Sequence, residues 1–184
     1  LLLCARLRNV IVHESRKDRI IAEPCDELTR LICHVAELLQ SPPQLSLLKP
    51  KKVTFLSSET ELGQAIEKIS KTNYSNLPVY DGKRLIGVLN NRRIVRVLGQ
   101  LLEQGGTIEE CLKLPCANVL HEDDMTRFYR ILGRQNTIQD VIDAFEENRK
   151  LLAVLVTVSG KPNDEIVNLL TSADLPMLIR FLDE

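Results

Sequence analysis

The chain lacks several features that would assign it to a common functional class. Its 184 residues carry a formal net charge of −1, which argues against a general binder of nucleic acid or anionic membranes, because such proteins normally have a basic excess. The longest apolar stretch, residues 151–158, is far shorter than the roughly 20 residues of a membrane-spanning helix. The apolar start is broken by Arg6 and Arg8, so it does not predict a signal peptide. No membrane partner is therefore expected.

Cysteine and histidine are too scattered to predict a disulfide framework or a metal site. The five cysteines include no C-x-x-C pair, which fits a reducing compartment, so we expect a cytoplasmic protein. Cys111, Cys116 and His121 follow one another at five-residue intervals and match no common zinc pattern. Gly105-Gly106 lacks the lysine context of a P-loop, and no Ser/His/Asp set can be assembled. These features favour a protein that is not an enzyme.

What the chain does contain is a duplicated apolar pattern. Apolar residues at 62, 65, 66 and 69 recur 76 positions later at 138, 141, 142 and 145, and this spacing marks one buried helix face. Each copy has the order strand, helix, strand, strand, helix. The expected elements are 53–56, 61–71, 77–80, 85–89 and 90–99 in the first copy, and 129–132, 137–148, 151–158, 166–170 and 172–182 in the second. Two copies that cannot bury their faces alone are expected to pack together around a cleft.

We therefore expect an α/β fold of two repeats preceded by an α-helical segment. The predicted divisions are a helical segment over 1–45, a first repeat over 46–99, a linker with one short helix over 100–127, and a second repeat over 128–184. The helical segment includes an amphipathic helix over 25–40 that Ser41-Pro42-Pro43 ends, because proline cannot continue a helix.

This duplication resembles the CBS domain pair, the regulatory module named after cystathionine β-synthase. The resemblance is carried by NLPVYD at 76–81, LIGVL at 85–89 and IVNLLTSAD at 166–174. It implies tandem βαββα repeats that often dimerise face to face and bind adenosyl nucleotides to regulate an attached partner. It therefore predicts a regulatory homodimer that signals to its N-terminal helices, with AMP, ADP, ATP or S-adenosylmethionine as candidate ligands.

The site motif of that family is a Thr or Ser at a strand end and an Asp three residues later, which here are Thr171 and Asp174. A hydroxyl at a helix start suits a phosphate, and a carboxylate one turn later can accept both ribose hydroxyls. The same spacing is also typical of a helix cap, and the two interpretations are compatible. Adenine is expected between apolar strands, in contact with Leu132, Leu152 and Ala153.

The first copy departs from this pattern, because Asn90 and Arg93 stand at the aligned positions. An arginine cannot accept ribose hydroxyls. Arg93, with Arg92 and Arg96, could instead hold ligand phosphates or simply form a solvated helix face. Arg134 is a further predicted nucleotide contact. We therefore expect one asymmetric site or one polyphosphate, and not two equivalent sites.

Residues 7–14 resemble the Arg-Asn-x-x-x-His signature of HEPN helical bundles, through Arg8, Asn9 and His13. In active members of that family the pair serves metal-independent RNA cleavage, with His as a general base and Arg stabilising the developing charge. Residues 1–45 would cover only part of such a bundle. The alternatives are therefore a HEPN-type ribonuclease with a CBS sensor and RNA as its substrate, a packing or dimerising role for this segment, or a ligand-free dimerisation scaffold.

Overall fold

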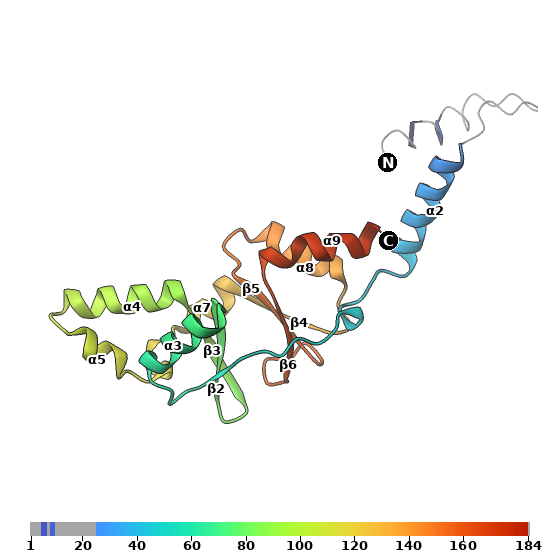
Figure 1. Ribbon diagram of the computed structural model, residues 1–184. Helices are drawn as coiled ribbons and strands as arrows, with labels where there is room; N and C mark the ends of the chain where they lie inside the picture. Colours follow the sequence, from blue (N-terminus) through green and yellow to red (C-terminus); the bar gives the residue numbers. More distant parts are fainter. Residues whose placement is uncertain (1–4, 7, 10–24, 184) are drawn as a thin grey trace, which may run out of the picture. The chain divides into compact units, whose positions relative to one another are not determined.

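The computed structural model describes residues 5–6, 8–9 and 25–183. The chain divides between Pro42 and Pro43 into two compact units. In the first unit, helix α2 (Asp26–Gln40) follows Cys25 and ends at Ser41 (Figure 1), which confirms the helix predicted over 25–40. None of its residues is buried. No helix of the described ranges is long and apolar enough to cross a bilayer.

The second unit contains two three-stranded sheets of identical topology (Figure 1). The strands are β1 (Leu56–Ser57), β2 (Asn76–Asp81) and β3 (Arg84–Asn90) in one sheet, and β4 (Tyr129–Gly133), β5 (Ala153–Thr157) and β6 (Ile166–Leu170) in the other. In each sheet the first strand is parallel to the second, and the second is antiparallel to the third. A register shift at Val79/Tyr80 recurs at Val156/Thr157. The predicted repeat is therefore confirmed as a repeat of topology.

Helices complete each repeat in the predicted order. They are α3 (Leu62–Thr72) and α4 (Asn91–Glu103) in the first repeat, and α8 (Ile138–Glu147), η2 (Ser172–Asp174) and α9 (Leu175–Asp183) in the second. The apolar stripe lies inward as expected, since Leu62, Ala65, Ile138 and Val141 have no exposed surface. The linker holds three short helices where one was predicted: α5 (Ile108–Leu112), α6 (Cys116–Val119) and α7 (Glu122–Phe128).

The two repeats pack against each other through their sheets. Leu85 and Val88 of β3 belong to the same buried cluster as Ala153 and Leu155 of β5. Each repeat also has its own core beneath its helices. The core of the second repeat includes Leu45, from the short 3-10 helix η1 (Leu45–Leu47) that precedes the first repeat. The duplicated helix faces are thus buried in two separate cores, one in each repeat, and the repeats meet through β3 and β5.

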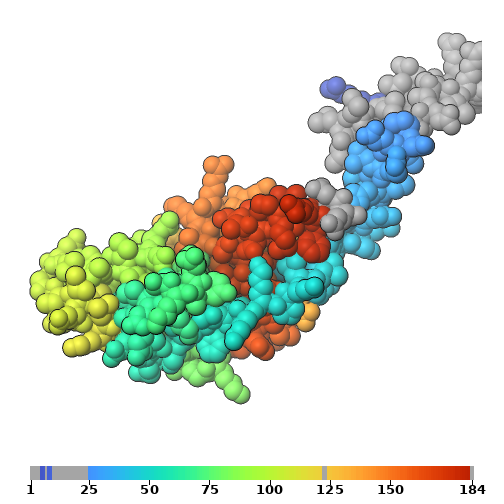
Figure 2. All heavy atoms as spheres, in the orientation of Figure 1, coloured from blue at the N-terminus to red at the C-terminus, as the bar shows by residue number. Residues whose placement is uncertain are grey.

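The segment that precedes β1 of the first repeat is hydrogen-bonded to β6 of the second repeat. We refer to residues 49–55 as the crossover segment, which is coloured cyan in Figure 2. The backbone N–H of Lys51 donates to the carbonyl of Val167 at 3.1 Å and to Oδ1 of Asn168 at 3.0 Å. The buried Asn168 also donates from Nδ2 to the carbonyl of Lys49 at 3.3 Å. The predicted strand over 53–56 is therefore wrong except at Leu56, because these hydrogen bonds hold residues before β1 against β6.

Candidate functional site

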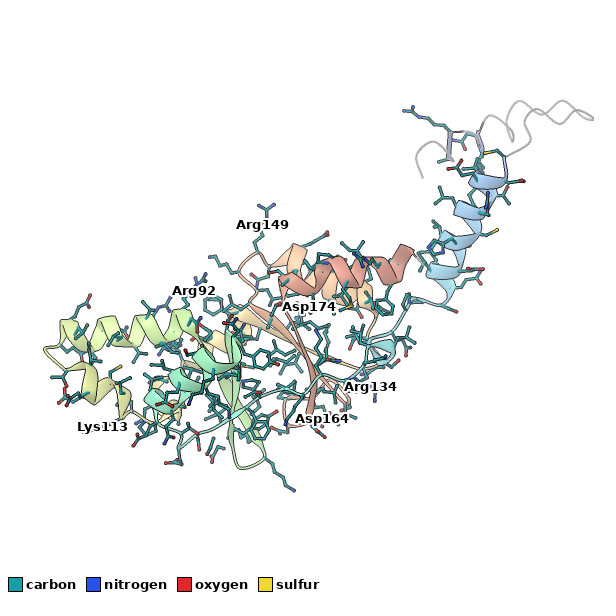
Figure 3. All side chains as sticks on the ribbon, viewed as in Figure 1. Arg92, Lys113, Arg134, Arg149, Asp164 and Asp174 are labelled. Atoms are coloured by element: carbon teal, nitrogen blue, oxygen red, sulfur yellow. The ribbon has the colours of Figure 1, made fainter. Side chains whose placement is uncertain are left out.

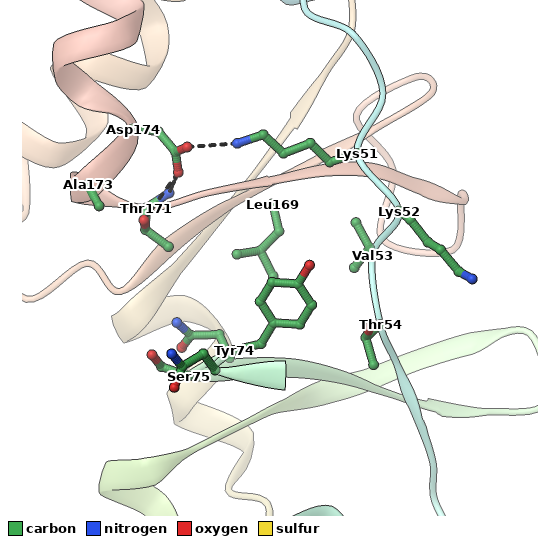
Figure 4. Close-up of a pocket in the computed structure, with 12 residues that line it drawn as sticks. Lys51, Lys52, Val53, Thr54, Tyr74, Ser75, Leu169, Thr171, Ala173 and Asp174 are labelled. Carbon is green, nitrogen blue, oxygen red and sulfur yellow. Dashed lines mark hydrogen bonds and ion pairs between the residues drawn. The ribbon is translucent and has the colours of Figure 1, made fainter. Parts of the chain in front are cut away.

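A pocket of about 390 Å³ lies between the two repeats (Figure 4). One wall comes from the first repeat, through the crossover segment and the loop between α3 and β2. The opposite wall comes from the end of β6 and the start of η2. The lining residues are Lys51, Lys52, Val53, Thr54, Asn73, Tyr74, Ser75, Asn76, Leu169, Thr171, Ala173 and Asp174. Both predicted motif residues, Thr171 and Asp174, are among them.

The carboxylate of Asp174 is held by local and distant donors. Its Oδ2 accepts from the backbone N–H of Thr171 at 2.8 Å and from the Thr171 hydroxyl at 3.2 Å, so the capping interaction typical of this spacing is present. Burial alone would raise the pKa of Asp174, but its hydrogen bonds with Lys51 and Thr171 and the Lys51 charge together lower it. The carboxylate is therefore kept ionised at the pocket wall.

Lys51 reaches across the pocket to the other oxygen of this carboxylate. Its Nζ lies 2.7 Å from Oδ1 of Asp174, although the two residues are 123 positions apart in the chain. The Lys51 side chain is about half exposed, at 53%, whereas the Asp174 side chain is 20% exposed. Figure 4 shows the neighbouring Lys52 pointing away from Asp174. In this structure Lys51 thus occupies one acceptor of the predicted ribose-binding group.

The remaining wall of the pocket is largely apolar and aromatic. The ring of Tyr74 lies beside the side chains of Leu169 and Val53 (Figure 4), and Tyr74 is 50% exposed. Tyr74 follows Asn73, whose backbone is left-handed with a φ of 59° and ends α3. A flat aromatic surface therefore faces the same space as the Asp174 carboxylate.

The equivalent place in the first repeat is closed. A cavity of only about 10 Å³ is lined there by Asn90, Arg92, Arg93, Arg96, Asp124, Phe128 and Leu152. The guanidinium of Arg93 donates from Nε to the carbonyl of Val119 and lies 3.9 Å from Oδ2 of Asp124. Asn90 accepts from the backbone N–H of Arg93 at 2.9 Å and so caps α4. The Arg93 side chain is 10% exposed, and with these partners it fills most of the space that is open in the second repeat.

A buried polar network connects the surroundings of the two cavities. Nδ2 of Asn90 donates to the hydroxyl of Tyr129 at 2.7 Å, and this hydroxyl donates to Oδ1 of Asn76 at 3.1 Å. Asn90 lines the small cavity and Asn76 lines the large pocket. Burial raises the pKa of Tyr129, so its hydroxyl keeps the proton that this chain of hydrogen bonds needs.

Each cavity combines the helix start of one repeat with the strand start of the other. Leu77 pairs with Leu89 as Val154 pairs with Leu170, so Leu152, two residues before Val154, corresponds to Ser75. Ser75 lines the Thr171 pocket, whereas Leu152 lines the Arg93 cavity. The site predicted from the sequence instead combined Leu152 and Thr171, which belong to the same repeat.

The other predicted nucleotide contacts lie outside the large pocket. Leu132 packs against the core of the second repeat, and Ala153 is fully buried between the sheets. Arg134 lies at the turn between β4 and α8, where its Nη2 donates to the carbonyl of Ser46 at 3.3 Å (Figure 3). Thr171 and Asp174 are therefore the predicted contacts that the structure brings together, while Arg93 and Leu152 share the small cavity.

The candidate ribonuclease residues fall in the N-terminal unit. Nη1 of Arg8 donates to Oδ1 of Asn9 at 3.1 Å. His13 lies outside the described residues. The ribonuclease hypothesis, which needs Arg8 and His13 together, therefore stays a prediction.

The pocket wall from the first repeat, above all Lys51 and Tyr74, was not among the predicted site residues. The repeat itself held a signal that could have located part of it. Each of the two cavities between the repeats is lined by the start of a helix from one repeat and by residues before a strand of the other. Applied to Thr171, this rule leads to the residues that precede β2.

Comparisons with known proteins agree with this architecture. The family model "CBS domain" matches residues 48–100. None of the curated proteins matches the chain in sequence. Among solved structures, CBSX2 in complex with AMP is 13% identical, with a TM-score of 0.57, over 77% of this chain and 99% of that one. The CBS domain of a bacterial CNNM/CorC family Mg²⁺ transporter in complex with ATP is 18% identical, with a TM-score of 0.54, over 84% of this chain and 97% of that one.

A third similar structure is the CBS domain of a CBS-domain-containing membrane protein from Sphaerobacter thermophilus. It is 14% identical, with a TM-score of 0.57, over 83% of this chain and 96% of that one. At these identities the likeness concerns the fold. The CBS-domain family model thus matches residues 48–100, and the two α/β repeats of the chain share the fold of CBS-domain structures.

Proposed function

We propose that residues 43–184 are a regulatory pair of CBS domains that binds one adenine nucleotide in the pocket between Tyr74 and Asp174. The observation that carries this proposal is that the motif residues Thr171 and Asp174 line an open pocket of about 390 Å³, within the range of small-ligand sites. The AMP and ATP complexes of two structural neighbours support the choice of ligand class.

The proposed contacts follow from the chemistry of the two walls. The ionised carboxylate of Asp174 accepts the ribose hydroxyls, which are neutral donors. The Tyr74 ring stacks on the adenine, because aromatic rings bind bases through their faces. Leu169 and Val53 complete the apolar surroundings of the base. The 10 Å³ cavity around Arg93 is too small for a second nucleotide, so the proposed stoichiometry is one ligand per chain.

The same chain segment provides a route from the pocket to the N-terminal helices. Lys51 and Val53 line the pocket, and the residues before them, Leu45 and Leu48, are anchored in the core of the second repeat. Residues 42–48 connect the end of α2 at Ser41 to the crossover segment. We propose that occupancy of the pocket changes the hydrogen bonds of the crossover segment and in this way acts on α2 and on a homodimer formed by the protein.

Calorimetry with AMP, ADP, ATP, S-adenosylmethionine and a cyclic dinucleotide tests the proposal. We expect one site for at least one adenine nucleotide, and binding weakened by more than about tenfold in Asp174→Asn, which loses the charge but keeps an acceptor oxygen. Asp140→Asn is the matched control, since Asp140 caps α8 in the same Thr-x-x-Asp spacing outside the pocket. Unchanged binding in Asp174→Asn would refute the proposed role of Asp174. No binding by any ligand would refute the proposal and favour a ligand-free scaffold.

A further inference from the structure

We infer that Lys51 makes this pocket selective for phosphorylated ligands, by holding Asp174 when the pocket is empty and moving to the phosphate when it is filled. The inference rests on the proposed function, because it concerns the same pocket. It names a specificity-determining residue that the motif Thr171/Asp174 does not contain.

The hydrogen bonds of Asp174 show why Lys51 matters for a ribose. Oδ2 already accepts from two donors of Thr171, and Oδ1 accepts from Lys51 at 2.7 Å. A ribose hydroxyl that approaches Oδ1 must therefore compete with a charge-assisted hydrogen bond, which is stronger than a neutral one. A neutral nucleoside that displaces Lys51 offers it no anionic partner in return. A nucleotide does, because its phosphate carries the negative charge.

The crossover segment is built so that the Lys51 side chain can move alone. Its backbone is fixed by the hydrogen bonds of the Lys51 N–H to Val167 and Asn168. Its side chain is about half exposed and has a flexible four-carbon stem. The ammonium group can therefore exchange the Asp174 carboxylate for a ligand phosphate while the wall of the pocket stays in place.

The pocket lining contains two neighbouring lysines. Its charged residues are Lys51, Lys52 and Asp174. Only Lys51 of the two lysines is paired with Asp174, and Lys52 points away from it (Figure 4). A specific role of Lys51 can therefore be separated from a general effect of positive charge by comparing the two neighbouring positions.

The test measures the affinity of adenosine and AMP by calorimetry for the wild type, Lys51→Met and Lys52→Met. We expect the wild type to bind AMP at least about tenfold more tightly than adenosine. In Lys51→Met this preference falls to less than about threefold, because AMP binds more weakly while adenosine binds equally well or better. In Lys52→Met the preference is kept. Melting curves of the three proteins verify that both variants are folded.

Two results would overturn the inference and leave nucleotide binding intact. One is equal affinity of the wild type for adenosine and AMP. The other is an AMP preference that Lys51→Met retains, or that Lys52→Met loses to the same extent, since either shows that Lys51 has no specific role. If the wild type binds neither adenosine nor AMP but binds ADP or ATP, this inference fails while the proposed function stands. If it binds no adenine nucleotide, both fail.

Discussion

The Arg93 guanidinium lies 3.9 Å from the Asp124 carboxylate, in an ion pair whose charges are reversed relative to Lys51 and Asp174. Arg93 lies three residues after Asn90, as Asp174 lies three residues after Thr171. The partner of Arg93, Asp124, lies in the segment before the second repeat, and the partner of Asp174, Lys51, lies in the segment before the first repeat. The Arg93 pair is largely buried and fills its cavity, whereas the Lys51 pair borders open space. An ion pair therefore lies at both equivalent places, and only the pair of Lys51 and Asp174 borders an open pocket among the described residues.

The free energy of unfolding at acid pH should depend on the ionisation of Asp174. Its pKa is lowered in the folded state, from an ordinary value of 3.8, so it stabilises the fold above about pH 4, and this contribution is lost as pH falls through the folded pKa. We predict that Asp174→Asn lowers the unfolding free energy at pH 7 by about 1 kcal/mol, given a cap and a half-exposed ion pair. Urea titrations of both proteins from pH 7 to pH 2.5 should converge at the acid end.

A matched carboxylate serves as the control for this measurement. Asp143 is exposed on α8, where Oδ1 accepts from the side chain of Gln139 at 2.7 Å. We expect Asp143→Asn to differ from the wild type by less than about 0.5 kcal/mol across the same range. A difference between wild type and Asp174→Asn that stays constant with pH would show that the Asp174 charge does not contribute.

Tyr74 is predicted to contribute to ligand binding through its ring and not through its hydroxyl. If the ring stacks on adenine, Tyr74→Ala should weaken AMP binding by about tenfold or more, while Tyr74→Phe should stay within about twofold of the wild type. Phe55→Ala is a suitable control, because Phe55 is also exposed but packs edge-on against Tyr80 outside the pocket. Equal losses in Tyr74→Ala and Phe55→Ala would contradict a specific stacking role.

The buried hydroxyl of Tyr129 is predicted to stabilise the contact between the repeats. Tyr129→Phe removes the shared partner of Asn90 and Asn76, and an unsatisfied buried polar group costs about 1–3 kcal/mol. Chemical denaturation should therefore show a loss of this size for Tyr129→Phe. Tyr74→Phe, at a half-exposed position, is the control and should lose less than about 0.5 kcal/mol. A Tyr129→Phe variant as stable as the wild type would exclude this role for the network.

The cysteines of the described residues should separate into two classes by reactivity. Cys25 and Cys33 are exposed, whereas Cys111 and Cys116 are buried. Burial raises the pKa of Cys116 to about 11 and also raises that of Cys111, and the thiolate is the reactive form. With iodoacetamide at pH 8, mass spectrometry should find Cys25 and Cys33 alkylated first, and Cys111 and Cys116 only after unfolding. Rapid modification of Cys116 in the native protein would contradict the packing of α6.

The apolar periodicity was sufficient to predict the repeated elements, because burial of one helix or strand face imposes a local and regular pattern. It predicted α3 and α8 with their buried residues Leu62 and Ile138, and it predicted both hairpins. It failed for the crossover segment and for the linker. The course of residues 49–55 depends on hydrogen bonds to β6, more than 110 positions away, and no local pattern contains that information.

The candidate site shows the same division between local and distant causes. Thr137 with Asp140 and Thr171 with Asp174 have one spacing, and in both cases the backbone N–H of the threonine donates to the aspartate carboxylate at 2.8 Å. The sequence by itself therefore determined two similar helix caps, since these contacts span three residues. Only the tertiary structure decided that one of them borders a pocket, because it brings Lys51 and Tyr74 of the first repeat to Asp174 of the second.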